Sequence, residues 1–201
     1  MKIICIGRNY SEHAKELNNP VPLEPLIFLK PDSAYLQSKK PFFYPNFSND
    51  IHYEGELVLK VGRNGRHIER KFAHKYYDEF TVGIDFTARD LQKNLKEKGW
   101  PWEIAKGFDG SAAIGTFIPF PKGTSSIQYS LRKNNEQVQT GDSKNMIFHF
   151  DEIISYVSQF FTLKMGDLIF TGTPAGVGPI SIGDVYQGYI GTEKVLDVKI
   201  L

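Results

Sequence analysis

The sequence predicts a β-rich α+β fold, and three observations lead to this prediction. Short runs of apolar and β-branched residues, each bounded by Gly, Pro, Asn or Asp, recur along the 201 residues. Helical spacing of apolar side chains appears in only three segments. The expected strands do not alternate regularly with the helices, which argues against a doubly wound parallel sheet. Because 41% of the residues are apolar, we expect one domain with a substantial core over residues 1–201.

The expected strands are short and are separated by turn residues. A Pro-rich stretch at residues 20–45 alternates with apolar residues, so it predicts ordered loops and edge strands rather than a flexible linker. The segments predicted to form strands are residues 2–7, 26–30, 56–61, 80–87, 114–120, 129–134, 168–173 and 194–201.

The three segments with helical spacing are residues 10–17, 88–99 and 149–161. The last of them begins near Asp151 and carries apolar side chains every three or four positions, which is typical of a helix packed against a core. The side chains of this apolar face are Ile153, Ile154, Val157, Phe160 and Phe161.

Composition and charge exclude several classes of function. Lys and Arg number 24 against 23 Asp and Glu, so a net charge of +1 predicts no nucleic-acid partner and no anionic membrane surface. The single cysteine, Cys5, lies in the apolar run "IICI", which excludes a disulfide framework and a cysteine metal cage. No apolar stretch approaches the roughly 20 residues that span a bilayer. We therefore expect a soluble, cytoplasmic protein.

Two glutamates stand close together in the segment "HYEGELVLKV". If the segment is a strand, Glu54 and Glu56 point to the same face, with their Cα atoms roughly 6.5–7 Å apart. On its own, such a pair is more typical of a solvated strand face, here with Lys60 nearby. His52 lies one pleat further out, and we expect it behind the site or at the surface.

A third carboxylate, Asp85, lies in an improbable setting between Ile84 and Phe86. An aspartate in such an apolar run is costly unless it is paired or bound to a ligand. Together with Glu54 and Glu56 it makes an oxygen-only donor set, which suits Mg²⁺ or Mn²⁺ better than zinc.

A second candidate constellation lies in "GRNYSEHAKEL". Asn9 or Ser11 could cap a short helix there, and His13 and Glu16 stand three residues apart on one face of that helix. A histidine held by a carboxylate can act as a general base, although the same spacing also suits an ordinary surface ion pair. The run "GTPAGVG" at 172–178 matches no nucleotide-binding loop; it could present backbone N–H groups to an anionic substrate or form a plain glycine turn.

Six motifs follow one another along the chain: "GRNYSEHAKEL", "LIFLKP", "HYEGELVLKVG", "GIDFTARDLQ", "GWPWEIAKGFDG" and "GDLIFTGTPAGVG". Together they resemble the fumarylacetoacetate hydrolase family over essentially the whole chain. The resemblance is strongest to its small members of the acylpyruvase and oxaloacetate decarboxylase type. Larger members carry an additional N-terminal domain, which we do not expect here because "GRNY" begins at residue 7.

The resemblance implies a fold and a set of site residues. The fold would be the family's roll of mixed β-sheet with few helices. Each functional position of the family motifs is filled in this sequence. The resemblance implies Glu54, Glu56 and Asp85 as metal ligands, His13, Glu16 and Lys106 as catalytic residues, and Arg8, Arg89, Gln92 and Thr173 as substrate-binding residues. In such relatives the helix that carries the dyad acts as a lid.

The chemistry that follows is that of a Mg²⁺- or Mn²⁺-dependent hydrolase or lyase acting on small 2-oxo acids. Such an acid chelates a metal through its carboxylate and adjacent carbonyl, which stabilises enolate charge at C3. We expect cleavage of the C3–C4 bond of acylpyruvates ahead of oxaloacetate decarboxylation.

Three further readings of the sequence stay open. One is a 2-hydroxy-diene-dioate isomerase, and another is an oxaloacetate tautomerase. The third, of another class, is a non-catalytic metal-carboxylate binding protein, which would have no use for the His13–Glu16 pair. The expected partner is a small-molecule substrate, and the family resemblance implies a homodimer.

Overall fold

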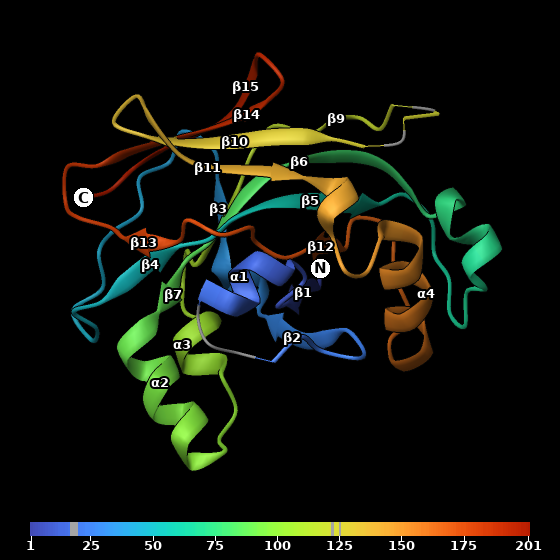
Figure 1. Cartoon of the computed structure of the whole chain (residues 1–201), viewed down its shortest axis with the longest axis horizontal. Coiled ribbons are helices and arrows are strands. Elements are labelled where there is room, and N and C mark those ends of the chain that lie inside the picture. Colours follow the sequence, from blue (N-terminus) through green and yellow to red (C-terminus); the bar gives the residue numbers. More distant parts are fainter. Residues whose placement is uncertain (17–19, 122, 125) are drawn as a thin grey trace.

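A computed structural model describes residues 1–16, 20–121, 123–124 and 126–201, and in these residues the strands form three sheets around a shared core (Figure 1). The strands are β1 (Ile3–Gly7), β2 (Leu26–Lys30), β3 (Tyr35–Gln37), β4 (Ile51–Tyr53), β5 (Gly55–Val61), β6 (Tyr77–Asp85), β7 (Thr87–Ala88), β8 (Ala112–Ile114), β9 (Ile118–Pro119), β10 (Gln128–Lys133), β11 (Glu136–Asp142), β12 (Leu168–Phe170), β13 (Gly178–Pro179), β14 (Val185–Ile190) and β15 (Glu193–Lys199).

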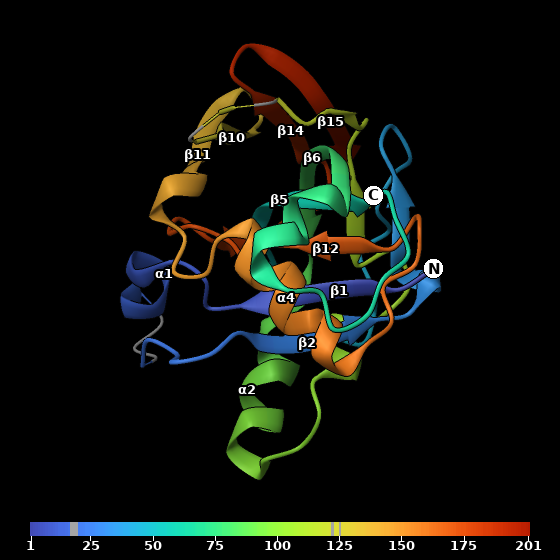
Figure 2. The same cartoon turned by 90° about the vertical axis from the view of Figure 1, so that its right-hand side faces the viewer.

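The largest sheet has the strand order β2-β1-β12-β5-β6-β8-β3, with β9 paired to β6. Figure 2 shows β6, β5, β12, β1 and β2 side by side in this order. Strand β1 pairs in parallel with β12, whereas β5 pairs in antiparallel with both β12 and β6. The sheet is therefore mixed, and the predicted β-rich α+β class is confirmed.

Two smaller sheets complete the architecture. A four-stranded sheet, β11-β10-β14-β15, lies over the large sheet at β5 and β6 (Figure 1), and a three-stranded sheet pairs β4 with β13 and β7. Gly188 of β14 allows this close approach, because a Cβ atom there would come within 2.8 Å of Val82 on β6. Tyr53 and Tyr186 also join two sheets, with their ring centroids 5.1 Å apart.

Each segment predicted to form a strand overlaps at least one, and the predictions for 80–87 and 114–120 each overlap two separate strands. The strands that the sequence did not indicate are β3, β4, β11, β13 and β14. Most of these are only two or three residues long, and β11 ("EQVQTGD") is mainly polar. A pattern of alternating apolar residues cannot mark strands that pair mainly through their backbones.

Helices lie outside the sheets. They are α1 (Ser11–Glu16), α2 (Arg89–Lys98), α3 (Glu103–Lys106) and α4 (Phe150–Phe160), with the 3-10 turns η1 (Asp32–Ala34), η2 (Arg70–Lys75) and η3 (Ser143–Asn145). The three predicted helices are confirmed, except that Leu17 lies outside the described residues. Helix α4 packs against η2 and buries Ile153, Ile154 and Val157 in the core, but Phe160 of the predicted apolar face is exposed. Among the helices that the structure describes, none is long and apolar enough to cross a bilayer.

Asn9 joins the segment before α1 to two distant loops. Its Nδ2 donates to the carbonyl oxygens of Phe148 and Thr171 at 2.9 and 2.8 Å, and its Oδ1 accepts from the Phe148 amide at 2.7 Å. Asn9 is fully buried. The prediction that Asn9 could cap the helix is therefore wrong, because its side chain instead holds the chain that leads into α1.

Replacing Asn9 by alanine should lower the free energy of unfolding by about 2–4 kcal/mol, because it leaves buried backbone groups of Phe148 and Thr171 without partners. Urea denaturation followed by circular dichroism measures the effect. Asn64→Ala is the matched control, since Asn64 accepts one exposed hydrogen bond from the Met165 amide, and it should cost less than about 1 kcal/mol. Equal losses in the two variants would contradict the anchoring role of Asn9.

Candidate active site

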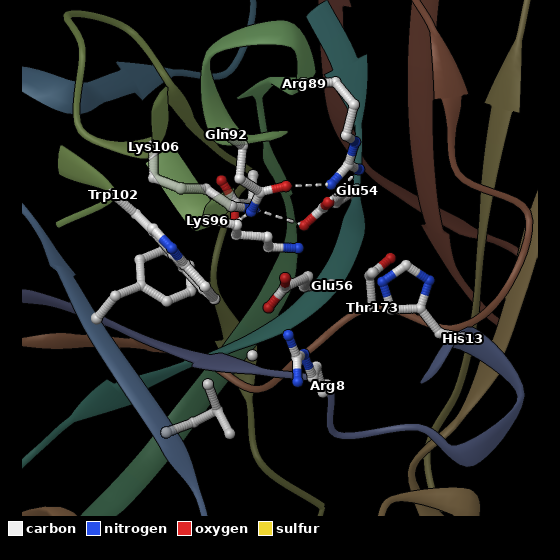
Figure 3. Close-up of a pocket in the computed structure, with 14 residues that line it drawn as sticks. Arg8, His13, Glu54, Glu56, Arg89, Gln92, Lys96, Trp102, Lys106 and Thr173 are labelled. Carbon is white, nitrogen blue, oxygen red and sulfur yellow. Dashed lines mark hydrogen bonds and ion pairs between the residues drawn. The ribbon is translucent and has the colours of Figure 1, made fainter. Parts of the chain in front are cut away.

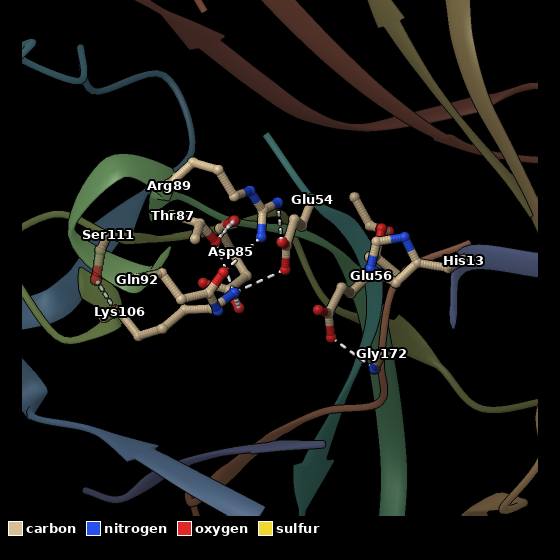
Figure 4. Close-up of polar contacts among 12 residues, drawn as sticks. His13, Glu54, Glu56, Asp85, Thr87, Arg89, Gln92, Lys106, Ser111 and Gly172 are labelled. Carbon is tan, nitrogen blue, oxygen red and sulfur yellow. Dashed lines mark hydrogen bonds and ion pairs between the residues drawn. The ribbon is translucent and has the colours of Figure 1, made fainter. Parts of the chain in front are cut away.

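The three carboxylates predicted as metal ligands lie together in one pocket. Glu56 is on β5, Asp85 ends β6, and Glu54 lies in a short break between β4 and β5. Pairing of β5 with β6 brings them together, and the Asp85 amide donates to the Glu54 carbonyl at 2.8 Å. Carboxylate oxygens of the three residues lie within 4.8 Å of one another, and each residue is buried (Figure 4). The segment 52–61 is thus not one continuous strand, yet both glutamates reach the same pocket.

Positive side chains lie directly among these carboxylates. Lys106, at the end of α3, places Nζ 2.7 Å from Glu54 Oε2, 2.7 Å from Asp85 Oδ2 and 2.6 Å from Thr87 Oγ1 (Figure 4). Arg89 pairs with the other oxygen of Glu54. The described part of the site therefore balances Glu54 and Asp85 with cations provided by helices α2 and α3.

Lys30 is a further buried cation, and the sequence reading passed over it. Its Nζ lies 2.7 Å from Asp85 Oδ1 and 3.0 Å from Ser111 Oγ, and it also donates to the Lys106 carbonyl oxygen. The Lys30 side chain has no exposed surface. In the sequence, this contact is indicated only by the position of Lys30 at the end of the apolar strand "LIFLK".

The pKa values of Glu54 and Glu56 are shifted in opposite directions. Burial alone would raise the pKa of Glu54, but Lys106 and Arg89 hold it well below its usual range. Burial, together with the negative charges of Asp85 and Glu54, raises the pKa of Glu56 well above its usual range. Among the described residues, Glu56 has no lysine, arginine or histidine within ion-pair distance, and its carboxylate accepts from the Gly172 amide at 2.6 Å. The site is short of positive charge at Glu56.

This arrangement fits a divalent cation. Glu54, Glu56 and Asp85 provide an oxygen-only donor set of the kind that Mg²⁺ and Mn²⁺ prefer. A cation there would provide the positive charge that Glu56 lacks. No cysteine lies among the donors, and the predicted role of His52 outside the donor set agrees with its contact to Asp50 at 2.9 Å.

His13 of the predicted dyad lines the same pocket. His13 is 5% exposed, and its Nδ1 lies 3.0 Å from Glu16 Oε2. Because a carboxylate can only accept, Nδ1 carries the proton and Nε2 is left as the basic nitrogen. The other oxygen of Glu16 accepts from the Gly176 amide at 3.0 Å, which fixes the carboxylate between α1 and the loop 172–178.

The loop "GTPAGVG" holds carboxylates of the protein itself. Its Gly172 amide donates to Glu56, and its Gly176 amide donates to Glu16. Gly172 has a φ of 100°, and a Cβ atom there would lie 2.6 Å from Asn9 Cβ, so only glycine fits. The site's own glutamates therefore occupy these two N–H groups, so neither Gly172 nor Gly176 presents its amide to a substrate.

Three of the predicted substrate-binding residues already have partners in the protein. Arg89 Nη1 donates to Gln92 Oε1 at 2.7 Å, and both residues line the pocket. Thr173 donates to the Gly55 carbonyl oxygen and accepts from Gln139 Nε2, each at 2.9 Å. The buried Gln139 was not identified from the sequence, because it lies on β11, which was itself not predicted.

Arg8 and Lys96 also point toward the cavity (Figure 3). Arg8 follows β1 with a left-handed φ of 57°, a strained conformation for a residue with a side chain. Lys96 lies on α2, with Nζ 5.3 Å from the centre of the Trp102 ring. Neither cation has a carboxylate within ion-pair distance among the described residues. Lys96 and Trp102 were not identified from the sequence, because a lysine near the end of a helix is usually solvated.

Comparison with known proteins adds three findings. The family model described as fumarylacetoacetate (FAA) hydrolase C-terminal matches residues 2–198. An oxaloacetate decarboxylase, mitochondrial, of Dictyostelium discoideum is 41% identical over 100% of this chain and 94% of its own. An oxaloacetate tautomerase of Escherichia coli is 39% identical over 97% of this chain and 92% of its own. With one mitochondrial relative and one bacterial, the cytoplasmic location stays a prediction.

Among solved structures, the chain is similar to a fumarylpyruvate hydrolase from Pseudomonas aeruginosa in complex with Mn²⁺ and pyruvate. The TM-score is 0.93 and the sequences are 37% identical, over 100% of this chain and 89% of that protein.

Replacing Glu56 by glutamine should weaken Mg²⁺ and Mn²⁺ binding at least about 100-fold, because it removes a ligand charge and keeps the shape of the side chain. Isothermal titration calorimetry with each metal measures the affinity. Glu79→Gln is the control, since Glu79 pairs with Lys60 on the surface of the same two strands. Unchanged affinity in Glu56→Gln, or a preference for zinc, would contradict a metal site at the triad.

Proposed function

This chain belongs to the fumarylacetoacetate hydrolase family, and from that premise we propose that it is a metal-dependent enzyme that interconverts the keto and enol forms of oxaloacetate. The observation that carries the proposal is the geometry of His13. Its basic Nε2 results from the contact of Nδ1 with Glu16, and its ring borders the pocket of the carboxylate triad. A structural metal site alone would need no such base.

The choice of reaction draws on the relatives as well. The sequence alone favoured acylpyruvate hydrolysis, but two relatives of 41% and 39% identity are named for reactions of oxaloacetate. Oxaloacetate also carries a second carboxylate, and the cavity offers Arg8 and Lys96 as cations without carboxylate partners among the described residues. Both observations support a 2-oxo dicarboxylate as the substrate.

Glu54, Glu56 and Asp85 would hold the metal, and the donor set favours Mg²⁺ or Mn²⁺. When bound, a divalent cation supplies positive charge to the carboxylate and 2-oxo oxygens of the substrate and so stabilises an enolate. The Mn²⁺ and pyruvate in the fumarylpyruvate hydrolase complex support this assignment.

The proton moves through His13. In the keto form, His13 Nε2 takes a proton from C3, the C–H electron pair forms the C2–C3 double bond, and the π pair of the C2 carbonyl moves to its oxygen. That oxygen then takes the proton back from the His13 imidazolium, which completes the enol and restores the neutral ring. Glu16 keeps the ring oriented and stabilises the imidazolium that forms. Because the Gly176 amide holds the second oxygen of Glu16, the carboxylate does not rotate away.

Lys106 maintains the charge balance beneath the substrate. Burial alone would lower its pKa, but Asp85 and Glu54 raise it above the usual value, so it stays an ammonium group. It holds Glu54 and Asp85 in place and adds positive charge next to the developing enolate. Arg89 pairs with Oε1 of Glu54, and Gln92 in turn accepts a hydrogen bond from Arg89.

Hydrolysis of acylpyruvates is the second candidate, and the similarity to a fumarylpyruvate hydrolase favours it. In that reaction His13 Nε2 would take a proton from water, whose oxygen adds to the C4 carbonyl. The C3–C4 bond then breaks, its electron pair goes to C3, and the His13 imidazolium returns its proton to C3, so that pyruvate and a carboxylic acid result. Decarboxylation of oxaloacetate leaves the same electron pair at C3 but needs no attacking water.

The three reactions should respond differently to the loss of His13. His13→Ala should lower kcat/KM for oxaloacetate tautomerisation and for acylpyruvate hydrolysis by about 10²–10⁴-fold, because each requires a positioned base. Decarboxylation should fall less, since breaking the C–C bond needs no base. Glu54→Gln should abolish all three. Each rate is measured at saturating Mg²⁺, so that weakened metal binding does not lower it.

His74→Ala serves as the control, because His74 is exposed and lies outside this pocket. Tautomerisation that survives in His13→Ala, or an equal loss of all three activities, would exclude His13 as the base. Wild-type protein that accelerates no reaction of oxaloacetate would overturn the proposed function itself.

A further inference from the structure

One face of helix α2 runs from the buried triad to the mouth of the pocket. Arg89, Gln92 and Lys96 lie three and then four residues apart, so they share this face, and all three line the cavity. The Arg89 side chain is 16% exposed and Gln92 is 4% exposed, whereas Lys96 is partly accessible to solvent. At 1.5 Å per residue, Lys96 lies about 10 Å along the helix from Arg89.

The inner part of this helix face is already occupied by protein contacts. Arg89 binds Glu54 and Gln92, and Gln92 accepts from Arg89. Lys96 differs from them because no carboxylate among the described residues lies within ion-pair distance of its Nζ. Its ammonium group lies against the Trp102 ring, and Figure 3 shows it directed into the cavity above Glu56.

A substrate held at the triad by its 2-oxo acid end must direct its other end toward the mouth. We infer that Lys96 is the specificity residue that binds the second carboxylate of a dicarboxylic substrate. The inference rests on the proposed function, because it takes the triad as the place where the 2-oxo acid end binds. Trp102 positions Lys96 by lying against its ammonium group.

Helix α2 also provides a matched control. Lys98 lies two residues further along, with Nζ 4.7 Å from the centre of the exposed Trp100 ring, but it does not line the pocket. Both lysines therefore make a cation–π contact from the same helix. Of the two, Lys96 alone faces the cavity. If Lys96 served only in surface packing, replacing either lysine should have the same effect on ligand binding.

Binding of two ligands that differ only in the second carboxylate tests the inference without any turnover. 2-Oxoglutarate has this carboxylate, and 2-oxopentanoate has a methyl group in its place. In calorimetry at saturating Mg²⁺, Lys96→Met should weaken 2-oxoglutarate binding about 10- to 100-fold and change 2-oxopentanoate binding less than about 2-fold. Lys98→Met should change neither, and Lys96→Arg should restore most of the preference.

The pH dependence gives a second readout. Burial, followed by the nearby charges of Arg8 and Arg89, lowers the pKa of Lys96 to about 8, with Lys106 acting in the same direction and Glu54 against it. Lys96 is therefore charged below pH 8 and loses its proton above it. The preference of the wild-type protein for 2-oxoglutarate should decline as the pH rises through about 8, and in Lys96→Arg it should persist, because arginine stays charged.

Equal weakening of both ligands in Lys96→Met would overturn the inference, because it would indicate a general effect on the pocket. A wild-type protein that does not prefer 2-oxoglutarate over 2-oxopentanoate would overturn it as well. Absence of oxaloacetate turnover with the ligand preference intact would instead contradict the proposed reaction and leave Lys96 as a carboxylate-binding residue.

Discussion

The structure depends on a cluster of opposite charges buried at the junction of β5 and β6. Asp85 has no exposed surface, and an isolated carboxylate in such a place would be very costly. Lys30 and Lys106 each contact it at 2.7 Å, and they come from β2 and α3, at different points in the chain. The cluster therefore joins the edge of the large sheet to the short helix that follows α2.

The positive charges of this cluster are unevenly placed, and this uneven placement connects the fold to the chemistry. Glu54 and Asp85 have cationic partners, while Glu56 has the Gly172 amide but no cation among the described residues. The three carboxylates are matched in number by Arg89, Lys30 and Lys106, but none of these cations lies within ion-pair distance of Glu56, so a metal ion bound there would supply the missing local charge. Arg8 and Lys96 add further positive charge at the cavity wall, which favours an anionic ligand.

The family relatives are named for different reactions, and the geometry explains how one pocket can serve them. Decarboxylase, tautomerase and hydrolase all pass an electron pair to or from C3 of a 2-oxo acid. In the proposed mechanism the charge cluster and its metal would stabilise that electron pair in each reaction. His13 would act where a proton must move, and Lys96 would act where a second carboxylate must bind.

Local patterns in the sequence were sufficient for the fold class and for part of the site. Strand alternation placed Glu54 and Glu56 on one side, and the spacing of His13 and Glu16 placed them on one helix face, because both patterns depend on neighbours in the chain. The apolar setting of Asp85 marked it as exceptional. The family resemblance then related Arg8, Arg89, Gln92, Lys106 and Thr173 to this site, and the structure places all five on the same pocket.

Contacts between distant segments were decided only by the tertiary structure. The Gly172 amide reaches Glu56 across 116 residues, and the Gly176 amide reaches Glu16 across 160. Lys30 ends an apolar strand, and nothing near it in the chain indicates that its ammonium group meets Asp85. Lys96 and Lys98 are alike in sequence and in their aromatic contacts. Only the orientation of α2 against the sheet turns one of them into the pocket, because a helix face acquires its surroundings from packing and not from its own residues.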